Sequence, residues 1–372
     1  MIKLLLTLLT LGISFYSVDS SAQIFRLRVS NYGVDENSPL FEQFKSFVDT
    51  EIAKIEKDIN KDLPSGQPHR LMEGMANSSV MAGKGIGSDY ASNMSVFLIG
   101  GGVGAGADLA KDETTDSDLS GIGIAPGLII GTNLGFMDTA RILGMDTNRL
   151  NVYLNFMGHK HKQKLDDKPG KESSAELDMT AMGVHFRYDW IQPRGSKLLG
   201  WGGVKFHLGY EYNKTDITFN SKINENVSQT DANGNVISGD IEGSPTAKIL
   251  VNTHSIPFEI STDVQLLYVL SLYGGLGIDY NFGQAKGAGS LNAGTSSVGC
   301  SNPAPNQICS DGTAVEVTPE ANIDATGKVN PFTYRGFAGV QLNLPYLRIF
   351  GQVDKSLGDD LIGATAGVRF VF

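Results

Sequence analysis

The sequence predicts an all-β membrane barrel of about ten antiparallel strands, preceded by an N-terminal segment that contains a helix. Three observations predict this fold class. Short segments in which apolar and polar residues alternate recur from Val96 to the end of the chain. No uninterrupted apolar run after residue 22 approaches the ~18 residues of a spanning helix. The last segment, Leu361 to Phe372, has one apolar face and ends on an aromatic residue.

The composition excludes several classes of protein. Of the 372 residues, 41% are hydrophobic, 19% are charged and 45 are glycine. A disordered chain is poorer in apolar residues, and a bundle of membrane helices is richer in them. The formal net charge of −10 argues against nucleic acid as a partner, because phosphate backbones attract basic surfaces.

Residues 1–22 have the parts of a secretory signal peptide. Lys3 supplies the positive start, a short apolar run follows, and Ser20-Ser21-Ala22 forms a small-residue cleavage site. The apolar run is short of the ~20 residues that span a bilayer, and no cysteine follows the cleavage site as a lipid attachment point. We therefore expect export through the secretory pathway.

Residues 23–93 differ from the rest of the mature chain. From Asn37 to Lys61 apolar residues recur at helical spacing, Ser38-Pro39 suits a helix start, and Pro64 suits its end. From Met72 to Asn93 the chain is rich in small residues. The sequence predicts an amphipathic helix followed by a small-residue hatch that plugs the barrel. The alternative is a helix that caps the mouth of the barrel.

Residues 94–372 form the predicted barrel. Its segments have roughly the 9–11-residue length that a tilted membrane strand needs. In one of the clearest, Met182, Val184 and Phe186 alternate with Gly183 and His185. The expected strands are 95–107, 120–133, 148–160, 176–190, 201–214, 250–264, 271–283, 331–344, 346–355 and 361–372.

The connections alternate between polar loops and compact turns, as expected when loops lie on one side of a membrane and turns on the other. The polar loops are 108–119, 161–175, 215–249 and 284–330. Asn233-Gly234 is a hairpin signal, so the strands that flank 215–249 are expected to continue above the membrane. Two interfacial aromatic belts are expected: Tyr210, Tyr212, Tyr280, Phe282, Phe332 and Tyr334 in one, and Tyr188, Trp190 and Phe372 in the other.

The C-terminal strand, LIGATAGVRFVF, alternates apolar and polar residues and ends with Phe370 and Phe372 on its apolar face. It resembles the terminal strand of Gram-negative outer-membrane β-barrel proteins, as a broad class. The resemblance implies a place in the bacterial outer membrane and periplasmic ends for the first and last strands. It also implies contact with outer-membrane lipid, and recognition of Phe370 and Phe372 by the barrel-insertion machinery.

Glycines alternate with apolar residues on the first two expected strands, which gives these strands a bare face toward the interior. Glycine in a strand often marks the close approach of another segment. We therefore expect residues 24–93 to pack against this wall as a plug; relief of sheet curvature is the alternative. The glycine wall consists of Gly100, Gly102, Gly104, Gly106, Gly121, Gly123 and Gly127, with Gly131 beyond them.

A cluster of charged residues is expected to face the interior. Its basic residues lie on two neighbouring strands. The expected register pairs His185 with His207 and Arg187 with Lys205. A cationic site could favour anionic solutes, because charged rings set pore selectivity. The other interpretation is that these cations pair with carboxylates of the barrel or the plug. The whole cluster is His185, Arg187, Lys205, His207, Glu211 and Asp279.

The remaining motifs give weaker evidence of a functional site. Cys300 and Cys309 lie close together in the loop 284–330, so a disulfide is expected in an oxidising compartment. The segment from Asp231 to Glu242 matches part of a calcium loop but has valine at the glycine position, and the hairpin signal already explains it. The glycines near Gly100 lack the helix that a dinucleotide site needs. We expect no metal, cofactor or catalytic residues.

The sequence therefore favours a narrow passive or gated channel for small solutes, since ten strands enclose little space. The alternative is a structural or surface-interaction protein whose loops 215–249 and 284–330 bind something outside the cell. A barrel that resembles the fatty-acid transporters, with an N-terminal hatch and a hydrophobic cargo, ranks third because those barrels have more strands. We expect no enzymatic activity, and no pattern indicates an oligomeric state.

Overall fold

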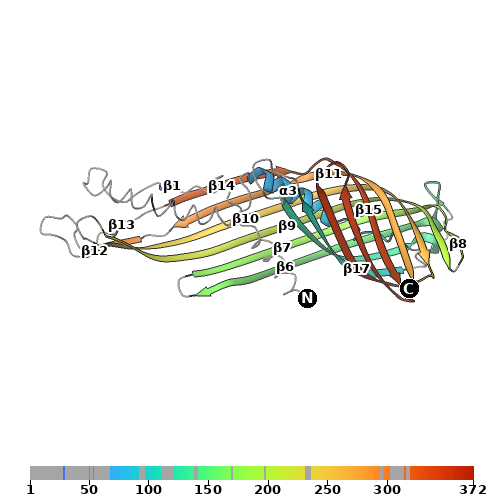
Figure 1. The fold of residues 1–372 in the computed structure, drawn as a ribbon, viewed down its shortest axis with the longest axis horizontal. Coiled ribbons are helices and arrows are strands. Elements are labelled where there is room, and N and C mark those ends of the chain that lie inside the picture. The colour runs from blue at the N-terminus through green and yellow to red at the C-terminus, as the bar shows by residue number, and fades with distance from the viewer. Residues whose placement is uncertain are drawn as a thin grey trace.

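The computed structural model shows one large antiparallel sheet that closes into a barrel (Figure 1). Residues 1–22, most of the predicted helix 37–61, Asn233-Gly234 and Cys309 lie outside the part of the chain that the structure describes. The described residues are 28–29, 50, 53, 68–91, 97–109, 120–137, 141–168, 171–196, 198–230, 236–293, 296–301, 314–315 and 319–372.

Ten strands form the closed ring, which confirms the predicted fold class. Each pairs with its neighbour along the chain, and β17 pairs with β2 to close the circle. The ring strands are β2 (Phe97–Asp108), β3 (Gly121–Asn133), β6 (Leu150–Lys168), β7 (Lys171–Ile191), β9 (Leu199–Thr230), β10 (Val236–Leu266), β11 (Leu270–Ala293), β15 (Phe332–Asn343), β16 (Leu347–Ser356) and β17 (Leu361–Val371).

The two end strands are joined at full length. Ala364 of β17 lies opposite Ala105 of β2, and at the chain's end the backbone N–H of Phe372 donates to the oxygen of Phe97 over 2.9 Å. An unpaired apolar edge would aggregate, and this closure removes it. The apolar alternation of the last strand therefore meets lipid rather than another chain.

Five neighbouring strands are much longer than predicted. β9 has 32 residues, a length of ~105 Å, whereas a tilted membrane strand needs ~10 residues. The continuation of β9 and β10 was predicted from the hairpin signal and is confirmed. The interpretation of 161–175 and 284–330 as loops was wrong, because β6, β7 and β11 extend into them. Side-by-side pairing satisfies the backbone in these polar stretches.

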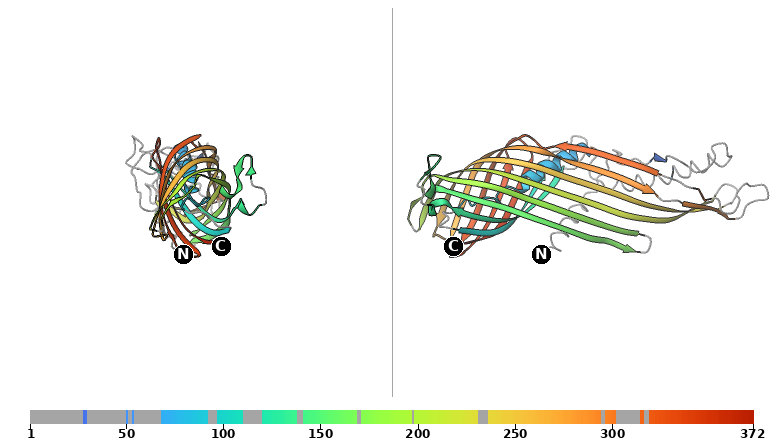
Figure 2. Two further views of the ribbon diagram at one scale, coloured as in Figure 1. Left: turned by 90° about the vertical axis from the view of Figure 1, so that its right-hand side faces the viewer. Right: turned by 180° about the vertical axis from the view of Figure 1, so that it is seen from behind.

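The long strands rise from one side of the ring as a curved sheet, which we call the outer extension (Figures 1 and 2). Short strands pair along its edges. Arg28 of β1 lies opposite Glu320 of β14, and Cys300 of β12 lies opposite Ile237 of β10. These edge strands are β1 (Arg28–Val29), β12 (Ser296–Ser301), β13 (Ala314–Val315) and β14 (Pro319–Lys328).

The opposite end of the barrel, the short-turn end, carries the chain's C-terminus and compact connections. Leu267 and Tyr268 turn β10 into β11 with positive φ angles of 54° and 60°. The remaining short elements at this end are η1 (Leu134–Phe136), β4 (Arg141–Ile142), β5 (Met145–Asp146), η2 (Thr147–Arg149) and β8 (Arg194–Gly195).

Helix α3 (Pro68–Ala82) lies inside the barrel and was missed from the sequence, which indicated only a small, flexible stretch from Met72 onward. Proline at the first helical position suits a helix start. The barrel wall contacts the helix from several directions, so only its first turns, with His69 and Glu73, reach solvent, and the helix is buried from Ala76 onward without a clear amphipathic pattern. Its upper part packs in an apolar cluster that contains Met72, Ala76, Val80, Val251, Ala285, Ala325 and Val329.

The outside of the ring is apolar and carries aromatic side chains at two levels. At the end toward the outer extension, ring contacts link neighbouring strands, among them His254 to Phe282 at 4.6 Å and Tyr280 to Phe332 at 5.3 Å. This aromatic band consists of Tyr210, Tyr212, His254, Tyr280, Phe282 and Phe332. Near the short-turn end, Trp190 contacts Phe206 at 5.2 Å. Both levels fit the interfaces of a bilayer.

Candidate functional site

The candidate site is the contact between the barrel wall and residues 68–91, which we call the interior segment. It consists of α3 and a following stretch without helix or strand that continues along the lumen toward the short-turn end (Figure 1). Almost all of its side chains from Asn77 to Ala91 are buried, and wall residues surround them on β2, β3, β10, β11 and β17.

The glycine wall lets the backbone of the interior segment lie directly on the strands. A Cβ atom on Gly104 would stand 2.0 Å from the oxygen of Ala82, and one on Gly106 would stand 2.2 Å from the oxygen of Ser78. On β3, a Cβ on Gly121 would meet the backbone of Gly74 at 2.1 Å. No side chain fits at such distances, so glycine is required for this packing. Gly123 lies against the backbone of Ser78 and Ser79 in the same way, whereas a Cβ on Gly127 would meet the side chain of Ile86 at 2.6 Å.

Two members of the glycine wall have a different role. A Cβ on Gly100 would collide with the backbone and side chain of Arg369 on β17, and one on Gly102 would lie 3.5 Å from the ring of Phe350. Arg369 crosses this space with its guanidinium 3.7 Å from the centre of the Phe350 ring. Gly100 and Gly102 therefore make room for a cation–π pair of the wall.

Lys84 is the central polar contact of the interior segment. Its ammonium group donates to Oε2 of Glu211 over 2.8 Å and to Oγ of Ser255 over 2.7 Å, and it lies 3.5 Å from a carboxylate oxygen of Asp279. The hydroxyl of Thr365 donates to the backbone oxygen of Lys84 over 2.5 Å. Four strands thus hold one residue, and its positive charge is buried among carboxylates.

Arg335 of β15 occupies the wall next to Lys84 and is fully buried. Its guanidinium donates to Asp279 over 2.8 Å and to Asp354 over 2.6 Å, and it also pairs with Glu259. Arg335 and Lys84 together face the four carboxylates of Glu259, Asp279, Asp354 and Glu211. The interior segment contributes one of the two cations in this group, so its removal would raise the excess of buried carboxylates over cations from two to three.

Asp89 is the corresponding contact near the short-turn end. Its carboxylate lies 2.7 Å from Nη1 of Arg348 and 3.5 Å from Nη1 of Arg369. The backbone of the segment is bound here as well: Arg187 donates to the oxygen of Asp89 over 2.5 Å, and Lys205 donates to the oxygen of Tyr90 over 2.6 Å. The interior segment therefore binds an acidic part of the wall through Lys84 and a basic part through Asp89.

The ring of Tyr90 fills the space beside these charges. It stacks on Tyr273 with centroids 5.6 Å apart and contacts Phe337 at 4.9 Å and His207 at 4.7 Å. The hydroxyl of Ser261 lies 2.9 Å from Nε2 of His207. Aromatic packing at this level leaves the lumen filled by side chains rather than by an open passage.

All six residues of the predicted charge cluster are buried in the interior, but they do not form one group. The register places Arg187 opposite His207 and His185 opposite Gly209, one side-chain repeat away from the predicted pairing of His185 with His207. Glu211 and Asp279 pair with Lys84, as described above. Arg187 lies 3.2 Å from Asp189, and Lys205 pairs with Asp263.

Sequence reasoning missed several residues of the site. Arg335, Arg348, Arg369, Glu259 and Asp263 all lie on the polar side of strands that were predicted correctly, so the alternation alone could have placed them in the interior. Lys84 and Asp89 gave a weaker signal: they are the charged residues within a stretch of small residues that faces a wall of glycine. Their partners lie 98 or more residues away along the chain.

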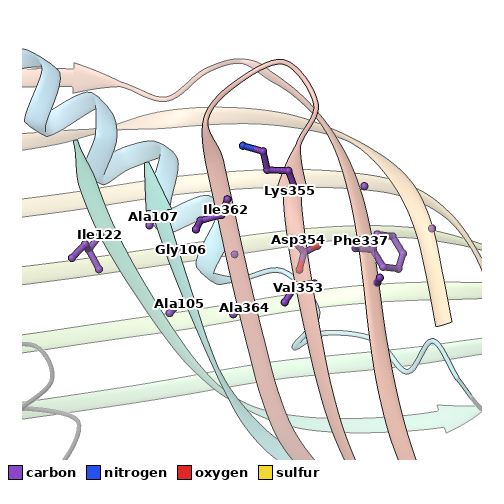
Figure 3. A pocket seen from close by; sticks show the side chains of 14 residues that line it. Ala105, Gly106, Ala107, Ile122, Phe337, Val353, Asp354, Lys355, Ile362 and Ala364 are labelled. Atoms are coloured by element: carbon purple, nitrogen blue, oxygen red, sulfur yellow. The ribbon is translucent and has the colours of Figure 1, made fainter. Parts of the chain in front are cut away.

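A shallow groove crosses the wall over β15, β16, β17, β2 and β3 (Figure 3). Small or apolar side chains line most of it, among them Ala105, Ile122, Val353 and Ile362, while Lys355 lies at its upper side. Its lining offers no nucleophile with a base, so it has no arrangement that supports acyl or phosphoryl transfer. Ile122, Val353 and Ile362 of this lining are on the outer surface of the barrel, whereas Phe337 and Asp354 are buried on its inner side.

The described residues also bear on metal binding, on a spanning helix and on the predicted disulfide. Among the described residues, no three His, Cys, Asp or Glu side chains are placed to hold a metal ion. Within the same part of the chain, no helix combines the length and apolar character needed to cross a bilayer. Because Cys309 is not described, the disulfide with Cys300 stays a prediction.

Comparisons with known proteins complete the description. A family model described as Lsa36-like matches residues 22–372. No curated protein matches the sequence. Similar solved structures include the transport unit of the autotransporter AIDA-I from Escherichia coli, which is 12% identical with a TM-score of 0.32 and covers 79% of this chain and 96% of that chain.

Two further structures are similar at the same low level. The translocator domain of the autotransporter NalP from Neisseria meningitidis is 11% identical with a TM-score of 0.29, over 75% of this chain and 90% of that chain. CarO from Acinetobacter baumannii is 11% identical with a TM-score of 0.22, over 73% and 97%. Similarities this weak carry no argument about function, and the fold stands on the strand pairing of the chain itself.

Proposed function

The chain belongs to the Lsa36-like family, and we propose that it is an outer-membrane β-barrel whose channel is closed by its own interior segment. The apolar exterior with aromatic side chains at two levels supports a membrane location. The secretory signal of residues 1–22 and the terminal aromatic residues Phe370 and Phe372 support export and insertion by the barrel-assembly machinery. In this orientation the short-turn end faces the periplasm and the outer extension faces the outside.

One observation carries the proposal of a closed channel. Lys84 and Asp89, both buried, neutralise opposite charges on the wall at two levels of the lumen. Removing one partner of a buried ion pair costs about 3–5 kcal/mol, because the other charge stays desolvated. The interior segment is therefore bound at defined positions, and solutes pass only when it is displaced.

The wall that displacement would expose is polar and carries both signs of charge. Arg187 and Lys205 lie near the short-turn end, while Glu211, Glu259 and Asp279 lie closer to the middle. The cations have carboxylates or backbone oxygens as partners, which favours the second interpretation of the predicted charge cluster. The proposed solutes are small and polar, without a preference for anions.

Conductance in a planar bilayer tests the proposal. The full chain is expected to be closed, and a chain without residues 24–93 is expected to carry a larger, steady current. Circular dichroism and retention in detergent show whether the shortened barrel still folds. If it folds and conducts no more than the full chain, the interior segment is not the closing element.

The outer extension favours a second candidate function, a surface-interaction protein. Its faces carry polar pairs, such as Lys248 with Asp216 at 3.0 Å and Lys160 with Glu176 at 2.6 Å, so it suits water rather than lipid. A chain whose hairpin is shortened by joining Asn220 to Thr246, which lie opposite each other, distinguishes the two functions. Unchanged gating with lost adhesion to a surface would favour the second candidate.

A barrel for hydrophobic compounds is the least supported option. The interior contains buried arginine, lysine and carboxylate side chains at every level between Met81 and Ala91, and such a lining disfavours an apolar cargo. We also propose no enzymatic role. Lipid that co-purifies inside the barrel, detected by mass spectrometry after detergent exchange, would revive the hydrophobic-cargo option.

A further inference from the structure

The interior segment runs through the barrel in one direction. Its first turns lie at the end toward the outer extension, where a Cβ on Gly121 at the start of β3 would touch Gly74 and one on Gly287 in β11 would lie 3.0 Å from the sulfur of Met72. Its last residue lies at the opposite end, where the side chain of Gln265 donates to the oxygen of Ala91 over 3.2 Å.

The contacts between these ends follow the same order. Ser78 lies against Gly106, Lys84 against Thr365, and Asp89 against Arg348, so each later residue meets the wall closer to the short-turn end. The next described residue, Phe97, begins β2 at that end and pairs with Phe372. Residues 68–91 therefore cross the lumen once and do not fold back as a hairpin. The first strand of the barrel, β2, begins at the end that they reach.

The chain before the helix provides an independent observation. His69 lies 3.0 Å from the backbone oxygen of Thr326 on β14, which is part of the outer extension. Further out, Arg28 of β1 lies opposite Glu320, and Glu320 lies opposite Asn292 near the end of β11. Strand β1 and the start of α3 are therefore both on the side of the outer extension.

We infer that the barrel presents part of its own N-terminal region at the cell surface: β1 and the start of α3 lie outside the outer membrane, and residues 68–91 run from that side through the lumen toward the first strand. The inference rests on the proposed orientation, with the short turns in the periplasm. The alternative of a helix that caps the mouth concerned residues 37–61, most of which lie outside the described part of the chain, so it stays a prediction.

If the inference holds, the lumen also anchors a segment of the chain at the cell surface. A segment that crosses a closed ring is anchored on both sides, since β2 pairs with β17 below it and β1 pairs with β14 above it. Pairing of β17 with β2 closes the wall around the segment, so the N-terminal part must be outside before or while the ring closes. The barrel is then the exporter and the anchor of a surface segment that belongs to the same chain.

Cysteine labelling of intact cells tests the inference. Arg28→Cys and His69→Cys are made separately in the full chain with Cys300→Ser and Cys309→Ser, and a membrane-impermeant biotin maleimide is added to Gram-negative cells that express it. Two controls flank β16: Leu357→Cys lies on the side of the outer extension, and Tyr346→Cys lies in a short turn. Both positions are well exposed, at 67% and 70%.

We expect Arg28→Cys and His69→Cys to be labelled on intact cells to within about twofold of Leu357→Cys. Tyr346→Cys should be labelled at least tenfold more strongly after the outer membrane is permeabilised. If the two N-terminal cysteines follow Tyr346→Cys instead, the inference is wrong although the membrane orientation holds. If Leu357→Cys also requires permeabilisation, the proposed orientation fails and the inference fails with it.

Strand pairing could shield a single cysteine, so a second measurement uses an antibody, which does not cross the outer membrane. An epitope tag inserted after Ile24 should be detected on intact cells. A tag that is detected only in lysed cells would overturn the inference, whatever the cysteines show.

Discussion

The ammonium nitrogen of Lys84 lies 2.8 Å from Oε2 of Glu211, and both side chains are buried inside the barrel. This contact joins the interior segment to β9, across 127 residues of sequence. It shows that the lumen is occupied by a specific partner for the wall charges. Most of the predictions below follow from the loss of such contacts.

Lys84→Met should weaken the hold of the wall on the interior segment. The substitution nearly keeps the length of the side chain but leaves Glu211 without its ammonium partner and Asp279 with Arg335 alone, which costs about 3–5 kcal/mol. Open events should become frequent in planar-bilayer recordings. The double variant Lys84→Met with Glu211→Gln should recover part of the closure, because the uncompensated charge is removed.

The matched control for this variant is Lys355→Met. Lys355 pairs with Asp360 at 3.7 Å, and their side chains are 54% and 63% exposed, so the pair contributes little. The conductance and melting temperature of the Lys355→Met protein should equal those of the unmodified chain. A Lys84→Met protein that stays as closed as Lys355→Met would contradict the role of the buried pair.

Gly106→Ala should displace helix α3 without altering any charge. The new Cβ would stand 2.2 Å from the backbone oxygen of Ser78, a distance that only movement of the helix can relieve. Gly351→Ala is the control, since nothing lies within 4 Å of the Cβ that it adds. We expect protease cleavage near Ala82 and a raised current for Gly106→Ala alone. Equal behaviour of both variants would show that the glycine wall does not position the helix.

Arg335→Met should destabilise the barrel itself. The side chain is the common partner of Glu259, Asp279 and Asp354, and its loss leaves three carboxylates desolvated together. The expected cost is at least about 3–5 kcal/mol and should appear as a lower unfolding temperature by circular dichroism in detergent. Adding Glu259→Gln and Asp354→Asn should restore much of the lost stability. Arg141→Met, at an exposed turn, serves as the neutral control.

Glu176 on the outer extension provides a prediction about pH. The hydrogen bond from Lys160, together with its charge, lowers the pKa of Glu176 below the ordinary glutamate value. Because the pKa of Glu176 is lowered, the ion pair is fully formed at pH values above the ordinary glutamate pKa. The pair is lost as the pH falls through the lowered pKa. Lys160→Ala should raise the pKa of Glu176 in an NMR titration. Because Lys160 is exposed and Glu176 is only half-buried, the melting temperature should hardly change.

The prediction of the ring from the sequence rests on a local property. In a membrane strand each side chain faces either lipid or the interior, so Val184 and Phe186 had to alternate with His185 and Arg187 whatever their partners were. The number of strands and the polar interior follow from the same rule. The glycine wall also indicated the close approach of another segment, although not which residues would make it.

The sequence by itself therefore determined that this chain is a closed barrel with an apolar outside, a polar inside and a bare glycine face. The tertiary structure decided that residues 68–91 descend through the lumen, that Lys84 and Asp89 meet carboxylates and guanidinium groups on distant strands, and that β6, β7 and β11 also extend far beyond the ring. The reason is physical. The alternation of a strand is fixed by the lipid on one face and the polar interior on the other, whereas α3 is enclosed by the wall from Ala76 onward, so no boundary with solvent imposes a helical period there.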